Sequence, residues 1–384
     1  MRQTALLAIL ILSASVVCAQ ERTDVVMSVD GVNRRFIVVQ PSAPAPIGGY
    51  PLVFMFHGSG GDGEQYYNVS GWKEKGEEEG FVTVFPSSLD YCVIEDGMQR
   101  RTTKWNNGDL RTYACPGQEL KDDVAFVRAM LDSITARLPI DPARIYTSGF
   151  SNGGVFSSKL AIDMSDVFAA AHASAGALDE LDSAGVVRNV PYVLTIGDHD
   201  DRLLEKSEFD VIPFNDTALG FIRPRLERHL AILGLTQEYA TTETELALLF
   251  SFTTPEADAP PAELRFILLK GLYHQYPNGE NYPLSAPDLM WEFFSARPLV
   301  SVVVDPVEGR PEITVVPNPA TAQLRIVGVE SSRVVLRSSL GATVAELPVG
   351  SDGRVALPAL PRGLYLMEIV TEEGPIVRRV IVGE

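Results

Sequence analysis

The chain has 384 residues, of which 46% are hydrophobic and 21% charged, and its formal net charge is −18. This length predicts a main domain with an accessory module, and the apolar content predicts a sizeable core rather than a disordered chain. An excess of acidic residues this large repels phosphate backbones, so nucleic acid is excluded as an expected partner.

The first 19 residues have the composition of a secretory signal peptide. Arg2 gives a positive start, an apolar stretch follows at 5–12, and Ala19 gives a small residue before the expected cleavage point. The stretch is too short for a membrane span, and we expect no transmembrane segment in the mature chain. Export favours a disulfide between Cys92 and Cys115, the two cysteines that remain after cleavage.

Short apolar runs alternate with helical patterns up to residue 297. The Asp30-Gly31 pair predicts a hairpin over 24–39. Further strands are expected at 52–56, 81–85, 144–147, 168–172, 192–196 and 264–269, and helices at 122–138, 155–162, 221–233 and 287–296. This order predicts an α/β domain over 20–297, with a mainly parallel sheet that carries helices on both faces.

The composition changes after Arg297. Residues 298–312 contain three prolines and no helical period, which is typical of a linker. Residues 313–384 show short alternating strands with glycine turns, which predict a small all-β sandwich domain. Within the larger domain, 91–115 and 202–261 are expected to be loops that shape a substrate pocket.

Gly149-Phe150-Ser151-Asn152-Gly153 fits the G-x-S-x-G nucleophile elbow. Such an elbow holds a serine on a tight strand-to-helix turn, where its neighbours must be small. Ser151 is therefore the candidate nucleophile. The backbone N–H of Asn152 can point at a developing oxyanion, and Ser59, in the glycine-rich turn after 52–56, is the candidate for the second donor.

The acid and the base are expected after the serine in the chain. Asp200 follows the strand at 192–196 and is the preferred acid, with Asp198 and Asp201 as alternatives. His274 lies in a glycine-rich loop after the strand at 264–269, where a triad base belongs. Of the other histidines, His229 is expected on a helix surface and His57 as a structural residue that holds its loop.

No cofactor or metal is expected, because the sequence has no C-x-x-C, H-E-x-x-H, P-loop or dinucleotide-binding pattern in the required context. Trp105 lies between the two cysteines. It is a candidate for the wall of the substrate pocket, and a buried tryptophan in a disulfide-held loop is the equal alternative.

Several segments together resemble the secreted polyhydroxybutyrate depolymerase and feruloyl esterase family of α/β-hydrolases. They are FHGSGGDGEQ, EEGFVTVFP, DDVAFVRAMLD, IDPARIYTSGFSNGG, FAAAHASAG and GLYHQYPNG. The resemblance spans roughly 23–297 and implies ester hydrolysis through an acyl-enzyme on Ser151, Asp200 and His274. Tyr276 stands where the family commonly has tryptophan before Pro277, so the pocket wall is expected to differ there.

The C-terminal segment is similar to the sorting domains of the type IX secretion system, through its Pro317-Asn318-Pro319 start, the Gly341 turn and GLYLMEI. This implies passage across the outer membrane, then release or attachment at the cell surface. We therefore expect a secreted, monomeric serine esterase acting on feruloyl or acetyl esters of plant polysaccharide. The alternatives are a polyester depolymerase, an acyltransferase or peptidase, and a non-catalytic surface binding protein.

Overall fold

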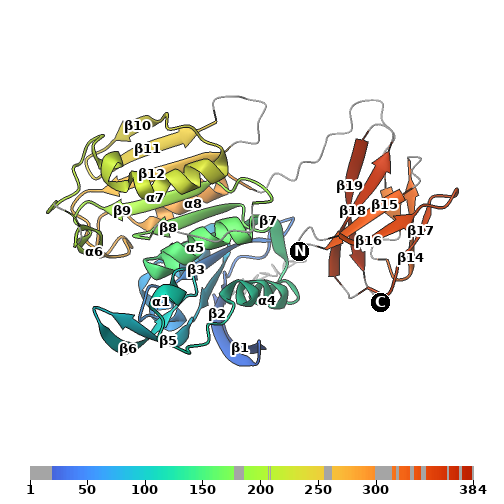
Figure 1. Ribbon diagram of the computed structural model, residues 1–384, viewed down its shortest axis with the longest axis horizontal. Helices are drawn as coiled ribbons and strands as arrows, with labels where there is room; N and C mark the ends of the chain where they lie inside the picture. The colour runs from blue at the N-terminus through green and yellow to red at the C-terminus, as the bar shows by residue number, and fades with distance from the viewer. Residues whose placement is uncertain are drawn as a thin grey trace, which may run out of the picture. The chain divides into compact units, whose positions relative to one another are not determined.

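The computed structural model divides the chain into two compact units, residues 1–300 and 301–384 (Figure 1). The described residues are 20–176, 186–205, 207, 209–254, 262–298, 314–316, 320–328, 333–338, 343–360, 363–371 and 374–382. The predicted signal peptide and all of the predicted linker except Pro298 lie outside these residues.

A ten-stranded sheet with the order β1-β2-β4-β3-β7-β8-β9-β12-β11-β10 forms the centre of the N-terminal unit. The strands are β1 (Glu21–Val29), β2 (Val32–Gln40), β3 (Tyr50–Phe56), β4 (Val82–Pro86), β7 (Ile140–Phe150), β8 (Ala170–Ser174), β9 (Tyr192–Gly197), β10 (Ala240–Glu243), β11 (Ala247–Thr253) and β12 (Glu263–Leu269). The six strands from β4 to β12 are parallel, and two strands at each edge are antiparallel. The predicted mainly parallel sheet is confirmed.

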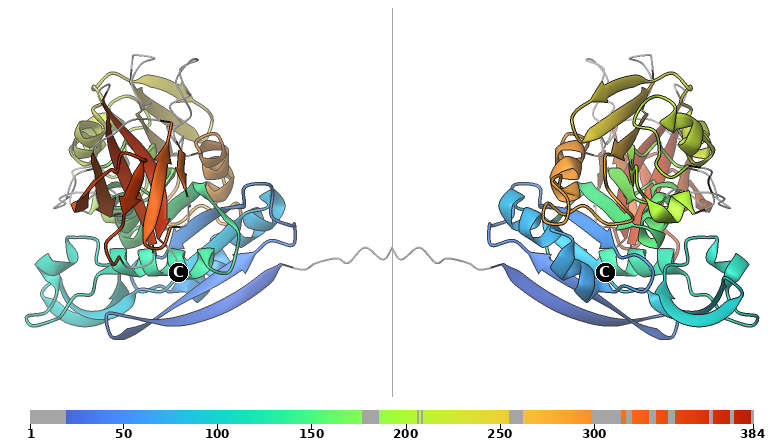
Figure 2. Two further views of the ribbon diagram at one scale, coloured as in Figure 1. Left: turned by 90° about the vertical axis from the view of Figure 1, so that its right-hand side faces the viewer. Right: turned by 90° about the vertical axis from the view of Figure 1, so that its left-hand side faces the viewer.

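Helices cover both faces of this sheet; Figure 2 shows α7 and α8 on opposite sides. The helices are α1 (Gly63–Val69), α2 (Trp72–Glu79), α3 (Leu110–Tyr113), α4 (Asp123–Thr135), α5 (Asn152–Asp163), α6 (Asp201–Leu204), α7 (Ala218–Leu233) and α8 (Ala286–Ser295). Successive residues of β3 point to different cores. Val53 packs in a cluster with residues of α2 and α8, whereas Phe54 packs in one with residues of α4 and α5. This double burial explains the continuous apolar run of β3.

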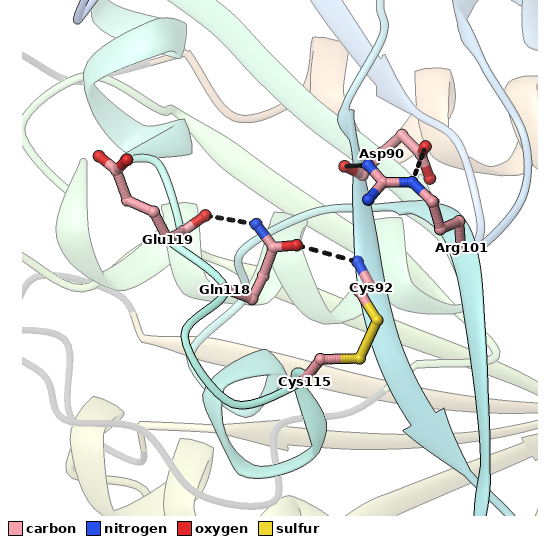
Figure 3. The surroundings of a disulfide bond; sticks show 6 residues. All are labelled: Asp90, Cys92, Arg101, Cys115, Gln118 and Glu119. Atoms are coloured by element: carbon pink, nitrogen blue, oxygen red, sulfur yellow. Dashed lines mark hydrogen bonds and ion pairs between the residues drawn. A yellow bond between two sulfur atoms is a disulfide. The ribbon is translucent and has the colours of Figure 1, made fainter.

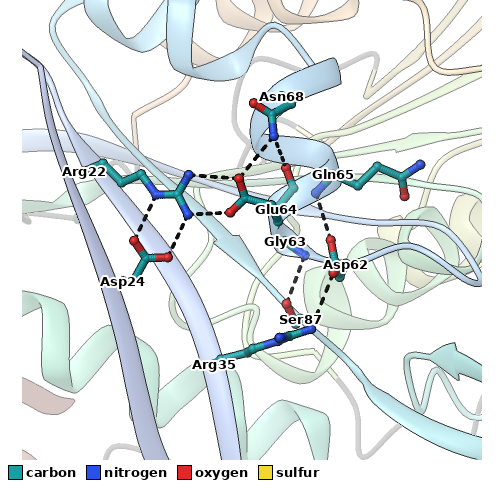
Figure 4. A network of polar contacts seen from close by, with 9 residues as sticks. All are labelled: Arg22, Asp24, Arg35, Asp62, Gly63, Glu64, Gln65, Asn68 and Ser87. Atoms are coloured by element: carbon teal, nitrogen blue, oxygen red, sulfur yellow. Dashed lines mark hydrogen bonds and ion pairs between the residues drawn. The ribbon is translucent and has the colours of Figure 1, made fainter.

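The loop after β3, which carries Ser59, leads into α1 and is held by polar contacts (Figure 4). Asp62 caps the helix by accepting the Gln65 N–H at 2.8 Å, and it pairs with Arg35 of β2 at 3.4 Å. Ser87, after β4, accepts the Gly63 N–H at 3.0 Å. These contacts fix the direction in which the chain leaves the sheet.

Residues 91–115 are not an irregular loop, so that prediction was wrong. The strands β5 (Leu89–Glu95) and β6 (Met98–Lys104) form a hairpin, with Asp96 and Gly97 at φ 53° and 74° in its turn. The Asp-Gly pair was the missed signal. β6 has no apolar alternation, because most of its side chains are exposed. The predicted disulfide is confirmed and ties the hairpin through Cys92 to Cys115, with the Cα atoms 5.4 Å apart (Figure 3).

The segment 202–261, also expected as a loop, contains α7 and the edge strands β10 and β11. The helix expected at 221–233 begins earlier, at Ala218. The strands were missed because β10 is exposed throughout and β11 alternates over only seven residues. None of the described helices is both long and apolar enough to span a membrane.

All described elements of the C-terminal unit are strands. They are β13 (Thr314–Val316), β14 (Gln323–Val327), β15 (Arg333–Ser338), β16 (Thr343–Pro348), β17 (Arg354–Ala356), β18 (Gly363–Thr371) and β19 (Gly374–Val382). They form two antiparallel sheets, β13-β14-β17 and β16-β15-β18-β19. Leu324 of the first sheet and Met367 of the second lie in one shared buried cluster.

Candidate active site

Ser151 occupies a turn that only small neighbours permit. It lies between β7 and α5 with φ 51° and ψ −120°, a strained conformation for a residue with a side chain. A Cβ on Gly149 would lie 2.1 Å from the carbonyl oxygen of Gly153. A Cβ on Gly153 would lie 2.4 Å from the carbonyl oxygen of Phe56. The two glycines of the motif are therefore required by close backbone approach, as the sequence motif suggested.

Three side chains from three strand ends form a hydrogen-bonded chain. His274 Nε2 lies 3.0 Å from Ser151 Oγ, and His274 Nδ1 lies 2.9 Å from Asp200 Oδ2. The Asp200 side chain is fully buried, and that of His274 is 18% exposed. A buried carboxylate on one ring nitrogen keeps the proton there, which leaves the other nitrogen free to accept a proton from the serine.

The two alternative carboxylates make other contacts. Asp198 Oδ1 lies 2.6 Å from His199 Nδ1 and accepts the Gly271 N–H at 2.6 Å. Asp201 accepts the backbone N–H of His274 at 3.4 Å and so does not contact the imidazole ring through that bond. Of the three aspartates, Asp200 is the one hydrogen-bonded to the His274 ring.

The expectation of a surface His229 was wrong. Its side chain is buried, and its ring stacks on Tyr192 with centroids 4.3 Å apart. Burial lowers the pKa of His229 to about 4, so the ring is neutral at pH 7. The charged residues next to His229 in the sequence suggested an exposed position. Tertiary packing, and not these neighbours, decides which face of the helix lies toward the sheet.

His57 is buried beside the loop that carries Ser59. Its Nε2 accepts the Ser88 N–H at 3.0 Å, so Nδ1 carries the ring proton and donates to the Gly58 carbonyl at 2.7 Å. Burial lowers the pKa of His57 to about 4, which keeps this tautomer neutral. The residue thus links the loop after β3 to the segment after β4.

A cavity of about 760 Å³ opens at Ser151. Ser59, Asn152 and His274 line it together with Ser151. Asn152 is the first residue of α5, where backbone N–H groups have no acceptor within the helix. The side chain of Asn152 contacts another segment, because its Oδ1 accepts the backbone N–H of Trp105 at 2.7 Å.

Trp105 supports the elbow from below and does not form the pocket wall, so that prediction is corrected. Its side chain is fully buried against Phe56 and Phe156, with ring centroids 5.1 Å away in each case. Its Nε1 donates to the His57 carbonyl at 3.0 Å. The alternative, a buried tryptophan, is what the structure contains.

Tyr276 is also turned into the core, which corrects the second pocket prediction. Its hydroxyl accepts the Trp72 Nε1–H at 2.7 Å and lies 3.3 Å from Ser148 Oγ. Phe150 lines the cavity and contacts the His274 ring at a centroid distance of 4.9 Å. Nothing in the sequence indicated that the Phe150 side chain would face the cavity.

Below the site lies a buried polar chain that the sequence did not reveal. His172 Nδ1 lies 2.9 Å from Ser148 Oγ, and its Nε2 lies 2.9 Å from Thr195 Oγ1. Burial lowers the pKa of His172 to about 3, so it is neutral. This series of hydrogen bonds joins β7, β8 and β9 close to the residues that form the site.

No family model matches the chain. Among curated proteins, it is 32% identical over 143 residues to feruloyl esterase B of Piromyces equi, covering 37% of this chain and 24% of that protein. It is 27% identical over 173 residues to the bifunctional acetylxylan esterase/xylanase XynS20E of Neocallimastix patriciarum, covering 45% and 22%. It is 29% identical over 127 residues to poly(3-hydroxyalkanoate) depolymerase C of Paucimonas lemoignei, covering 33% and 28%.

The matches therefore span between 22% and 28% of the length of these three relatives. Among solved structures, acetyl xylan esterase from Aspergillus awamori aligns with a TM-score of 0.46 and 16% identity, covering 72% of this chain and 99% of that chain. Esterases and a polyester depolymerase are what the chain is similar to in sequence.

Proposed function

We propose that the chain is a serine carboxylic-ester hydrolase of the α/β-hydrolase fold. The observation that carries the proposal is the hydrogen-bonded series of Ser151, His274 and Asp200 at the carboxyl ends of β7, β12 and β9. The chain order of serine, acid and histidine is the order that α/β-hydrolases use. Similarity to feruloyl and acetylxylan esterases supports the same reaction class.

In the proposed mechanism, His274 Nε2 takes the hydroxyl proton as Ser151 Oγ attacks the ester carbonyl carbon. The backbone N–H groups of Ser59 and Asn152 stabilise the oxyanion. His274 then protonates the leaving alcohol, and an acyl-enzyme ester remains on Ser151. A water molecule, deprotonated by the same histidine, hydrolyses that ester. Asp200 holds the ring in the required tautomer throughout.

We propose feruloyl or acetyl esters of plant polysaccharide as the substrate class, with extracellular polyhydroxybutyrate as the alternative. The names of the relatives support both classes. Enzymes that act on insoluble polyesters usually need an additional polymer-binding domain. The C-terminal unit instead resembles a sorting domain, so we prefer the polysaccharide esters. A signal peptide at 1–19 and type IX sorting through 313–384 remain part of this proposal and place the enzyme outside the cell.

The test compares the mature chain with Ser151→Ala on p-nitrophenyl butyrate, methyl ferulate, acetylated xylan and polyhydroxybutyrate. We expect at least one ester to be cleaved, and Ser151→Ala to lower kcat by about 10⁴-fold or more. Circular dichroism of both proteins checks that each is folded. A folded wild type that cleaves none of the four would overturn the esterase proposal and favour the surface binding protein.

A further inference from the structure

The cavity at Ser151 has the opposite charge balance to the chain as a whole. The sequence contains 32 Lys and Arg against 50 Asp and Glu residues. Among the described residues that line the cavity, five are cationic and two are acidic. The cationic ones are Arg100, Arg101, Lys104, Arg202 and Arg225; the acidic ones are Glu95 and Asp109.

We propose that this cavity selects esters that carry a free carboxylate close to the ester bond that is cleaved. The inference rests on the proposed function, because it concerns the substrate of the same serine. It narrows that function from esters in general to anionic esters.

The β5–β6 hairpin supplies a cation that its own carboxylate does not neutralise. Lys104 Nζ lies 2.8 Å from Glu95 Oε1, and Arg100 pairs with the other oxygen of the same Glu95. Two cations therefore share Glu95, while Arg101 of the same hairpin pairs with Asp90 at 2.8 Å. Lys104 is only 6% exposed, and this burial lowers its pKa to about 8, so the ammonium is still mostly protonated at pH 7. Arg100 is 59% exposed and is able to turn toward a ligand.

A second cation comes from a different part of the chain. Arg202 lies in α6, two residues after Asp200, and lines the same cavity. It is exposed, and within the described part of the chain it makes neither an ion pair nor a hydrogen bond. The hairpin and α6 together give the lining of the cavity a surplus of positive charge. Of these two elements, α6 lies directly beside the proposed catalytic acid.

A carboxylate fits this arrangement better than a neutral sugar or aryl group. An arginine guanidinium binds a carboxylate through two parallel hydrogen bonds, which adds geometric selection to the charge attraction. An anion that approaches a chain of net charge −18 is repelled at long range, so its binding requires a local region of opposite sign. Two substrate sources offer this chemistry: the free-acid end of a short polyester, and a uronate in an acetylated polysaccharide.

The first test uses two esters of equal chain length and identical leaving group, 4-nitrophenyl hydrogen glutarate and 4-nitrophenyl valerate. We expect kcat/KM at 10 mM salt to be about tenfold higher for the glutarate, a difference of about 1.4 kcal/mol. We expect this ratio to fall toward one at 1 M salt, because the Debye length shrinks from about 30 Å to about 3 Å. A ratio of one or less at both salt concentrations would overturn the inference.

The second test removes one cation at a time. We expect Arg202→Gln to lower the glutarate-to-valerate ratio about fivefold, within the range of an exposed charge contact. The matched control is Arg137→Gln, which removes an exposed arginine that lines a separate groove, and the ratio should not change. Equal ratios in wild type and Arg202→Gln contradict the assignment of that residue.

Hydrolysis of neither ester by folded protein means that the proposed function fails, and the inference falls with it. Hydrolysis of both at equal rates leaves the esterase intact and overturns the inference alone. Two natural sources then separate the outcomes: 3-hydroxybutyrate trimer as the free acid against its methyl ester, and acetylated glucuronoxylan against acetylated xylan without uronate. Preference for the acid within one pair identifies the source, and no preference in either pair contradicts the inference.

Discussion

The carboxyl ends of β7, β9 and β12, which carry the proposed triad and are called the edge below, and the walls of the cavity are built differently. At this edge, backbone atoms approach so closely that Gly149 and Gly153 admit no Cβ. At the walls, the hairpin β5–β6 lies outside the main sheet and presents charged side chains that are partly exposed. The edge thus holds the proposed triad in place, and residues of the walls can vary without disturbing it.

The largest expected effect at the edge comes from Asp200→Asn. An amide in this place favours the wrong tautomer of His274, so we expect kcat on every cleaved ester to fall about 10⁴-fold. Kinetics on p-nitrophenyl butyrate measures this. The matched control is Asp201→Asn, since Asp201 accepts the backbone N–H of His274, whereas Asp200 contacts its ring. A larger loss in the control than in Asp200→Asn would assign the acid to Asp201.

The second prediction concerns stability at the edge. Gly149→Ala would place a methyl group 2.1 Å from the Gly153 carbonyl oxygen, and we expect it to lower the free energy of unfolding by about 3 kcal/mol or more. Gly220→Ala is the control, because this glycine of α7 has open space around it; we expect a gain of up to about 1 kcal/mol. Urea unfolding measures both, and a Gly149→Ala protein as stable as wild type would refute the close approach.

The third prediction addresses the wall. Replacing Cys92 and Cys115 together by serine removes a cross-link between residues 23 apart, and we expect a loss of about 3 kcal/mol from the free energy of unfolding. The kcat for p-nitrophenyl butyrate should change little, because the bond lies in the wall and not at the edge. Reductant added to wild type should reproduce the effect and leave the double variant unchanged. A collapse of kcat in the folded variant would mean that wall and edge are coupled.

The smallest expected effect is a pH dependence of the free energy of unfolding that comes from buried His229. The pKa of buried His229 is lowered to about 4 in the folded state, against about 6.5 when unfolded, so the unfolded chain binds the proton more tightly. This stabilisation is complete above pH 6.5 and is lost as the pH falls toward 4, at about 1.4 kcal/mol per pH unit. Urea unfolding at pH 7, 6 and 5 should show a shallower slope for His229→Phe than for wild type. Equal slopes would contradict the neutral, buried ring.

The sequence predicted most of the edge because its requirements are local. The strand Tyr192–Gly197 is apolar throughout, and the G-x-S-x-G motif encodes the small residues that the turn needs. The preference for Asp200 followed from its spacing after that strand, with Gly197 and two further residues before the acid, and the structure has it bonded to the His274 ring. The wall was predicted poorly, because Met98–Lys104 is polar and exposed and lacks a pattern that distinguishes a strand from a loop.

The sequence by itself therefore determined where the core strands lie along the chain, the small residues at the elbow and the types of the proposed reacting groups, since each depends on neighbours in the chain. Only the tertiary structure decided which way individual side chains point. Trp105 and Tyr276 turned into the core because their rings find aromatic or hydrogen-bonding partners distant in sequence, and Phe150 turned toward His274. The positive cavity likewise exists only in three dimensions, because its cations come from segments about one hundred residues apart that folding brings to one serine.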